Sequence, residues 1–328
     1  MSAVWQPSAW AEIDFKYEHG NLDVDGDMGE QYGPPELNQL LLLGLPGADD
    51  GQLDWRRNMD RSFYPTVTEP CGGRNSPGIS QQYDEIVLSG RFDIGNQTLS
   101  AVLGYSDLGW DSYADTDASP LAIFVSGINE SFEQMSFELV WTSPSGRTVD
   151  FLAGFYGHDN ELSNDQPNLF DPTYTLAPGA YGFDQVYTNG SFTTASRLWS
   201  FFATATWNIT PRIRLTGGAR YADETKDYRR AAQCLPVRDG VIDFDPSEED
   251  RQLFEENASA FVCGTLDGFS DDRRSTSLMP EVAVEWDAGD GALWYAKYSS
   301  SRKSGGFAGA LVVAADSIEY DDEQGSGF

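Results

Sequence analysis

Short turns and long connecting segments alternate strictly along this chain, and between them apolar and polar residues alternate with a period of two. A period of two is typical of a β-strand with one apolar face. In one such stretch Trp199, Phe201 and Trp207 alternate with Ser200, Thr204 and other polar residues. The pattern predicts nine strands, over residues 11–23, 86–94, 98–106, 135–141, 149–155, 199–209, 212–221, 281–287 and 294–299.

The connections decide which architecture these strands form. Short turns fall at 95–96, 143–146, 210–212 and 288–291, and long segments at about 24–82, 111–130, 161–192, 230–275 and from 303 onward. In an up-and-down sheet, every short turn then lies at one end and every long loop at the other. Outer-membrane barrels sort their loops in this way, whereas a soluble β-sandwich has no reason to. We therefore expect an all-β fold: an antiparallel up-and-down transmembrane β-barrel segment of about nine or ten strands, with short periplasmic turns and long extracellular loops.

Three tryptophans support a membrane setting. Trp141, Trp207 and Trp286 each lie within three residues of a short turn. Indole rings at one depth are typical of the aromatic girdle at a membrane interface. The alternative is that they cap an ordinary core.

Charged residues on the other face of the strands agree with a water-filled or plugged lumen, because unpaired charges inside a closed core are strongly unfavourable. These residues are Glu138, Arg214, Arg220, Glu281, Glu285 and Lys297. Nine strands cannot close a bacterial single-chain barrel, and an open sheet would leave two unpaired edges in lipid. We therefore expect residues 1–328 to be one partial barrel domain without a plug domain.

Charge and composition exclude other classes. The 328 residues contain 21 Lys and Arg against 52 Asp and Glu, for a net charge of −31, so no nucleic-acid partner is expected. With 40% hydrophobic residues, the chain is too apolar for an acidic disordered segment. There is no G-x-S-x-G motif, and only His19 and His158 are available as a catalytic base, so we expect no enzyme.

Metal and cofactor sites are not expected either. The three cysteines, Cys71, Cys234 and Cys263, include no C-x-x-C pair. The acidic run from Asp23 to Asp27 departs from a calcium-binding loop, and the cluster at 248–256 is interpreted as a solvated loop. Cys234 and Cys263 bracket one polar segment and can close it as a disulfide in an oxidising compartment, which leaves Cys71 unpaired.

Several segments, in order along the chain, resemble TonB-dependent outer-membrane receptors of the iron-complex or siderophore type. The matching segments are Leu103–Ser106, Asp115–Pro120, Ser131–Ser143, Phe151–Tyr156, Arg214–Tyr228 and Leu293–Phe307, within a region of resemblance at 83–323. The last one, LWYAKYSSSRKSGGF, has Ser301 where the family usually has Gly. The family's signal, TonB-box peptide, plug and C-terminal strand are not found in the sequence.

The resemblance implies energised uptake of a scarce ligand, above all a ferric siderophore, across the outer membrane of a Gram-negative bacterium. Implied partners are the TonB complex, through the plug and TonB-box region, and outer-membrane lipid and lipopolysaccharide. Ligand contacts are expected from aromatic residues in or beside loops: Trp110, Tyr113, Tyr181, Phe183 and Tyr187. Three alternatives stay open: a soluble or surface β-rich binding module, transport of a vitamin or glycan, and a passive porin. The direction of the apolar faces separates the first of these from a barrel.

Overall fold

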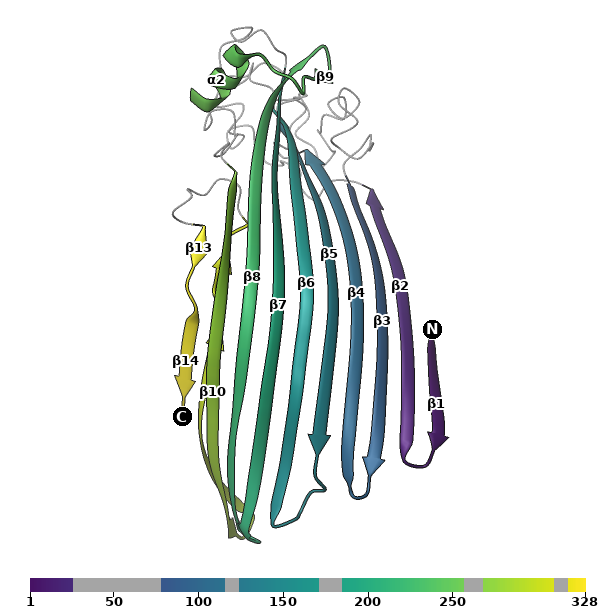
Figure 1. Ribbon diagram of the computed structural model, residues 1–328, viewed down its shortest axis with the longest axis vertical. Coiled ribbons are helices and arrows are strands. Elements are labelled where there is room, and N and C mark those ends of the chain that lie inside the picture. The colour runs from purple at the N-terminus through teal and green to yellow at the C-terminus, as the bar shows by residue number, and fades with distance from the viewer. Residues whose placement is uncertain (26–77, 116–123, 171–184, 257–267, 310–317) are drawn as a thin grey trace, which may run out of the picture.

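The computed structural model describes residues 1–25, 78–115, 124–170, 185–256, 268–309 and 318–328. Eleven strands lie side by side in chain order in one antiparallel sheet (Figure 1). They are β1 (Ser2–Ser8), β2 (Ala11–Asp25), β3 (Gly78–Ile94), β4 (Gln97–Asp115), β5 (Phe124–Thr142), β6 (Val149–Phe170), β7 (Gln185–Thr210), β8 (Ile213–Arg238), β10 (Phe269–Gly289), β11 (Ala292–Lys303) and β14 (Glu323–Gly327). The predicted fold class, an up-and-down sheet with its short turns at one end, is confirmed.

Three short strands pair outside this order. Strand β9 (Val241–Ile242) forms a hairpin with β8, and β12 (Gly306–Phe307) pairs with β13 (Glu319–Tyr320) in a small separate sheet. Strands β9 and β13 lie in the half of the molecule that carries the long connections (Figure 1).

The predicted count of nine or ten strands is too low, because the two edge strands lack a readable pattern. In β1 the register shifts between Trp5 and Ser8, around Pro7, which has no N–H to donate. Strand β14 has the sequence EQGSG, without one large apolar side chain. Pairing with β2 and β11, respectively, places these segments in the sheet.

The central strands are also much longer than predicted. Strands β7 and β8 contain 26 residues each, which corresponds to about 85 Å of extended chain, whereas crossing a bilayer takes about 9–11 residues. Apolar alternation stops near Trp199 and Tyr221, but pairing continues to Gln185 and Val237. Strand pairing therefore extends into segments that the sequence pattern assigned to loops.

One face of the sheet is apolar and open near the short turns. Directly paired positions such as Leu88, Leu103 and Phe137 form apolar rows across neighbouring strands. Exposure is 47% at Leu103 and 56% at Phe201. The side chains that the sequence placed outward all lie on this face: Phe137, Trp199, Phe201, Leu215 and Trp294.

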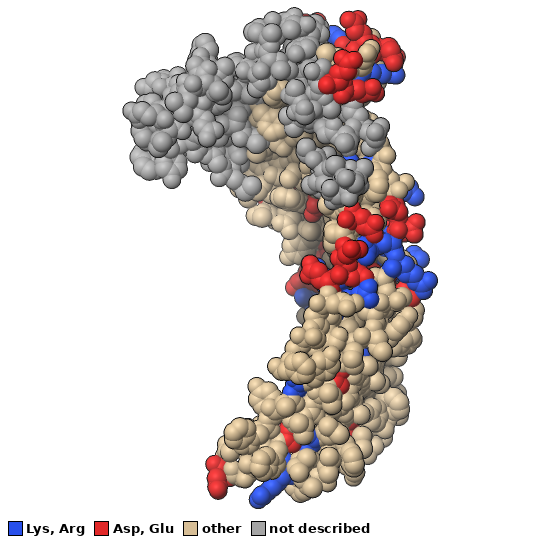
Figure 2. Space-filling view, turned by 90° about the vertical axis from the view of Figure 1, so that its left-hand side faces the viewer, with Lys and Arg blue, Asp and Glu red and all other residues tan. Residues whose placement is uncertain are grey.

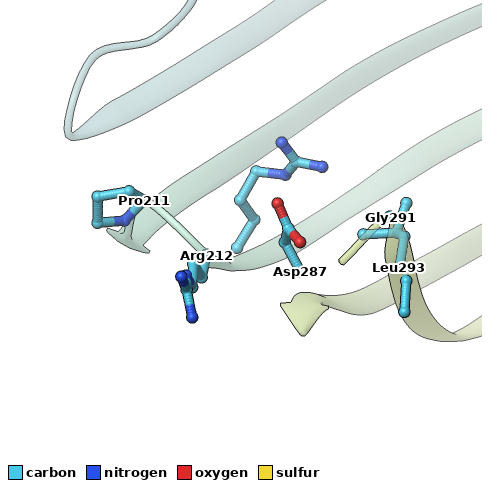
Figure 3. A pocket seen from close by; sticks show the side chains of 7 residues that line it. Pro211, Arg212, Asp287, Gly291 and Leu293 are labelled. Carbon is cyan, nitrogen blue, oxygen red and sulfur yellow. The ribbon is translucent and has the colours of Figure 1, made fainter. Parts of the chain in front are cut away.

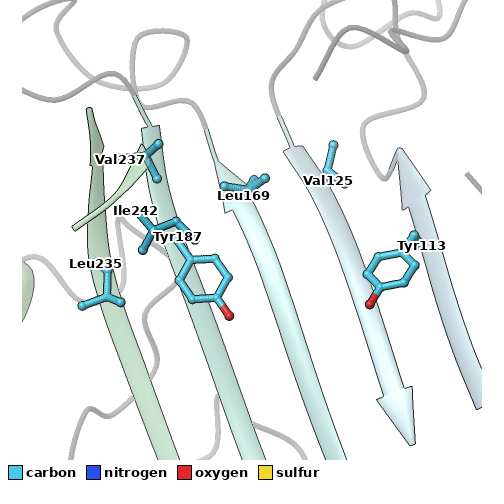
Figure 4. Packing of buried hydrophobic residues seen from close by; sticks show 7 residues of the cluster. All are labelled: Tyr113, Val125, Leu169, Tyr187, Leu235, Val237 and Ile242. Carbon is cyan, nitrogen blue, oxygen red and sulfur yellow. The ribbon is translucent and has the colours of Figure 1, made fainter. Parts of the chain in front are cut away.

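At the long-loop end the same strands carry a buried cluster instead (Figure 4). It contains Tyr113, Val125, Leu169, Tyr187, Leu235, Val237 and Ile242, and each is at most 9% exposed. In Figure 2, charged side chains form a band at mid-height, above a lower part that is mostly uncharged.

Helix α2 (Glu248–Glu256) occupies the segment that we interpreted as a solvated loop. Ser247 caps it, because its Oγ accepts a hydrogen bond from Asp250 N at 3.1 Å and donates one to the Asp250 carboxylate at 2.7 Å. Arg238 at the end of β8 pairs with Asp250 at 2.9 Å, which ties the helix to the sheet. In the described part of the chain, no helix is long and apolar enough to cross a membrane.

Candidate functional site

The face opposite the apolar surface is lined by paired charges. Lys297 of β11 lies 2.8 Å from Glu281 of β10, whose carboxylate also accepts a hydrogen bond from Thr204 at 3.3 Å. Arg214 of β8 donates through Nε to Glu285 at 2.7 Å. Because side chains two residues apart share a face, these residues line one wall. The sequence placed them on this face.

Two hollows meet on this wall. One of about 230 Å³ lies between β7, β8, β10 and Ser304, and one of about 400 Å³ lies closer to the short turns. Arg220 and Met279 border both. The rest of the polar lining consists of hydroxyl side chains, one more arginine and three carboxylates: Thr204, Ser275, Ser277, Ser299, Ser300, Ser304, Arg302, Glu138, Glu224 and Glu281.

The segment after β11 folds back over the upper part of this wall; we call Ser304–Ala308 the strap. Lys226 of β8 donates to Ser304 Oγ at 2.7 Å and to the Gly305 carbonyl at 2.9 Å. A Cβ added at Gly305 would collide with the Tyr320 carbonyl, so this close approach requires glycine.

Asp322 holds the strap to the two neighbouring strands. Its carboxylate accepts hydrogen bonds from Gly305 N at 2.6 Å, from Ser275 of β10 at 3.2 Å, and from Arg302 of β11. Burial acts to raise the pKa of Asp322, but the bonds from Gly305, Arg302 and Ser275 outweigh it and lower the pKa to about 2. Asp322 is therefore a charged anchor at neutral pH.

Stacked rings hold the other end of the strap. Tyr228 of β8, 1% exposed, stacks on Phe307 with ring centroids 5.0 Å apart and an interplanar angle of 15°. Its hydroxyl donates to the Ala308 carbonyl at 3.1 Å, and Phe192 of β7 stacks on its ring at 6.1 Å. Spacing alone does not reveal the strap, because its partners lie about 80 residues earlier in the chain.

The aromatic residues predicted to contact a ligand occupy different surroundings. Trp110, Tyr113 and Tyr187 lie in strands, near the ends of β4 and β7 that lead into the long connections. Tyr113 is 2% exposed and donates to Asn129 Oδ1, Tyr187 is 7% exposed, and Trp110 is half-buried. Tyr181 and Phe183 lie outside the described residues.

The three predicted girdle tryptophans lie at the short-turn end of the apolar face. Trp141 is 45% exposed, and Trp207 and Trp286 are each 51% exposed. Trp286 is paired with Trp294, which is 65% exposed. The cross-strand register supplies this second indole.

A third hollow, of about 280 Å³, lies between two short turns (Figure 3). Pro211 and Arg212 line it from one turn and Gly291 and Leu293 from the other, and Asp287 N donates to the Arg212 carbonyl at 2.8 Å. The hollow thus joins neighbouring hairpins.

Cys234 lies in β8 rather than in a loop, which corrects part of its prediction. It is disulfide-bonded. The other two cysteines, Cys71 and Cys263, fall outside the described residues.

Comparison with known proteins identifies the family to which this chain belongs. The sequence profile described as "TonB dependent receptor-like, beta-barrel" matches residues 13–315. This chain belongs to the TonB-dependent receptor β-barrel family. Members are transporters rather than enzymes, and they reside in the outer membrane of Gram-negative bacteria. No curated protein matches the chain.

Solved receptor structures share the fold. The ferric yersiniabactin uptake receptor FyuA from Yersinia pestis matches with a TM-score of 0.58 and 12% identity, over 96% of this chain and 38% of that one. The siderophore receptor PiuA from Acinetobacter baumannii gives 0.56 and 11%, over 98% and 45%. The ferric-catecholate import receptor Fiu from E. coli K12 gives 0.52 and 13%, over 92% and 42%. The chain thus spans less than half the length of these receptors.

In barrels of this family the strands alternate between an apolar outer face and a polar lumen face. The charged wall, with the strap and the hollows beside Arg220, has the character of the lumen face.

Proposed function

We propose that this chain forms part of the wall of an outer-membrane receptor that imports a ferric siderophore with energy delivered by the TonB complex. The observation that carries the proposal is the sheet itself: an up-and-down sheet with an open apolar face, a charged opposite face, and a family match over residues 13–315. The barrel provides the wall and performs no covalent chemistry.

The apolar face supports contact with outer-membrane lipid. Side chains such as Leu103, Phe201 and Trp294 are 47%, 56% and 65% exposed, and a soluble monomer rarely exposes so large a contiguous apolar surface. The face lies open rather than inside a closed core, which argues against the soluble binding module. We propose that lipid covers it and that lipopolysaccharide contacts its upper border, with Trp141, Trp207 and Trp286 at the periplasmic interface.

The proposed ligand class is taken from the relatives. The solved receptors named above take up ferric yersiniabactin, a siderophore or ferric catecholates. At 11–13% identity they support the fold, so the siderophore is our proposal and a vitamin or a glycan is the alternative.

The candidate ligand contacts differ in how deeply they are buried. Tyr113 and Tyr187 belong to the buried cluster, so we propose that they support the base of the external loops. Trp110, which is half-buried at the upper end of β4, keeps the proposed role of ligand contact, together with Tyr181 and Phe183.

We also propose that Cys234 is bonded to Cys263. The pair would close a loop of about 30 residues between β8 and β10, on the external side. Mass spectrometry of a non-reduced digest tests this directly, because a Cys71–Cys234 peptide would contradict it.

Radioactive iron uptake tests the function. The receptor that contains this barrel is expressed in cells that lack other siderophore receptors, with and without an intact TonB complex. We expect ⁵⁵Fe uptake from at least one ferric siderophore, and loss of this uptake without the TonB complex. TonB-dependent uptake of cobalamin or an oligosaccharide instead of any iron complex would replace the proposed ligand, and uptake that persists without TonB would indicate a porin.

A further inference from the structure

Arg220 projects from the middle of β8 onto the lumen wall, and neighbouring strands hold it in place. Its Nη2 donates to Ser200 Oγ at 2.9 Å, and Ser200 is fully buried. The guanidinium carbon lies 6.0 Å from the centre of the Tyr156 ring and 5.9 Å from that of Phe202. A cation near two ring faces is attracted by their quadrupoles. Three contacts from β6 and β7 therefore fix this side chain.

Arg220 differs from other cations of the same wall. Arg214, Lys226, Arg273 and Lys297 each have a carboxylate within 4 Å. In the described part of the chain, no carboxylate lies within that distance of Arg220. Its bond to Ser200 uses one N–H, and a guanidinium carries five. Arg220 therefore carries a positive charge and N–H donors that it does not use, in a chain whose net charge is −31.

The space beside Arg220 is suited to a small molecule. The two hollows that share Arg220 and Met279 measure about 230 and 400 Å³, within or near the usual range for ligand sites. Phe202 offers a flat ring next to the guanidinium, and Thr204, Ser299 and Ser300 offer hydroxyls. Glu138 and Glu281 also line this hollow, and the Glu281 carboxylate is paired with Lys297 at 2.8 Å. These groups fit a flat molecule with one anionic end.

We propose that Arg220 is an anion-binding point on the lumen wall, which binds the carboxylate of a small planar organic anion lying in the hollow beside Phe202. The guanidinium fork matches two carboxylate oxygens, and its fixed position reduces the entropy lost on binding. The inference rests on the proposed function in one respect: the anion belongs to a ligand that the receptor carries. A carboxylate from another part of the receptor is the competing occupant.

The test uses benzoate, a planar carboxylate, and benzamide, its neutral isostere, with the complete receptor purified from outer membranes in detergent. Saturation-transfer difference NMR detects weak binding of both probes. We expect benzoate to bind and benzamide to bind at least about tenfold more weakly, because the charge-assisted bonds are lost. Arg220→Gln should weaken benzoate about tenfold or more, and Arg220→Lys by less, since lysine keeps the charge without the fork.

Arg214→Gln is the matched control, because Arg214 lies on the same strand and face but its guanidinium is already paired with the Glu285 carboxylate. It should leave benzoate binding unchanged. Migration of unheated samples in SDS gels confirms that each variant is folded. Equal binding of benzoate and benzamide, no benzoate binding to the native receptor, or an unchanged affinity in Arg220→Gln would each overturn the inference. Those results leave the iron-uptake experiment unaffected, and failure of iron uptake with benzoate binding intact contradicts the proposed ligand alone.

Discussion

The two ends of the lipid-side face carry similar residues in opposite surroundings. Near the short turns, Leu103 and Phe201 are 47% and 56% exposed, whereas toward the long loops Leu169 and Val237 on the same face are 1% and 0% exposed. Strand pairing is continuous between the two ends, so backbone structure does not explain the difference. In the proposed function, lipid hydrocarbon covers the first set, whereas the second set is buried within the protein itself. One sheet therefore combines a membrane protein surface with a core typical of soluble proteins.

A row of acidic side chains separates these regions on part of the sheet. Asp84, Asp107, Glu133 and Glu161 occupy directly paired positions on β3, β4, β5 and β6. Like charges opposite one another destabilise a sheet. Placing any of these carboxylates in hydrocarbon would also be energetically unfavourable. The row marks where the apolar surface ends.

The sharpest test compares the same truncation in both regions. Leu169→Ala should lower the free energy of unfolding by about 2–5 kcal/mol, because the packed surroundings leave a cavity. Leu103→Ala should cost about 1 kcal/mol or less, because lipid chains can fill the space. Urea titration of the receptor in lipid vesicles measures both values, and equal losses would show that Leu103 is packed against protein.

A charge on the lipid side should have the next largest effect. Leu103→Arg should cost about 2–4 kcal/mol near the bilayer midplane. Val102→Arg, one residue away on the lumen face and paired with Glu138, should cost far less. The same titration measures both variants, and a greater loss for Val102→Arg would reverse the assignment of the faces.

The strap anchor should show a pH-dependent effect. Asp322→Asn should lower the free energy of unfolding by about 1–3 kcal/mol at pH 7, because it weakens hydrogen bonds between charged groups. The folded-state pKa of about 2 lies below the ordinary value of 3.8. The stabilisation is therefore complete above pH 4 and is lost as the pH falls towards 2. Unfolding titrations at pH 7 and pH 3 should show a smaller gap between native and variant at pH 3, and the neighbouring Asp321→Asn should show little change at either pH.

The acidic row should give the smallest effect, with the opposite sign. Asp107→Asn should raise the free energy of unfolding by about 0.2–1 kcal/mol at low salt, because it removes a like charge between Asp84 and Glu133. The gain should shrink as added salt screens the row. A loss of stability at low salt would mean that Asp107 makes a favourable contact.

Much of the fold could be predicted from the sequence, because the lipid-side residues obey a simple rule. A strand between hydrocarbon and a polar lumen must alternate apolar and polar side chains. Phe137, Phe201 and Trp207 could therefore be assigned to the apolar face from the sequence. Above the membrane that constraint disappears. The long upper parts of β7 and β8, the edge strands β1 and β14, and helix α2 therefore had no readable pattern.

The candidate site likewise has features that the sequence predicts and features that depend on the tertiary structure. The sequence by itself determined which face of each strand is polar, and hence that Arg220 and Glu281 line the lumen, because alternation fixes side-chain direction. Only the tertiary structure decided which of these charges pair, that the strap folds back onto Lys226 and Tyr228, and that Arg220 has no carboxylate within 4 Å among the described residues. Those outcomes depend on cross-strand register and on contacts between residues about 80 positions apart, which local sequence patterns do not encode.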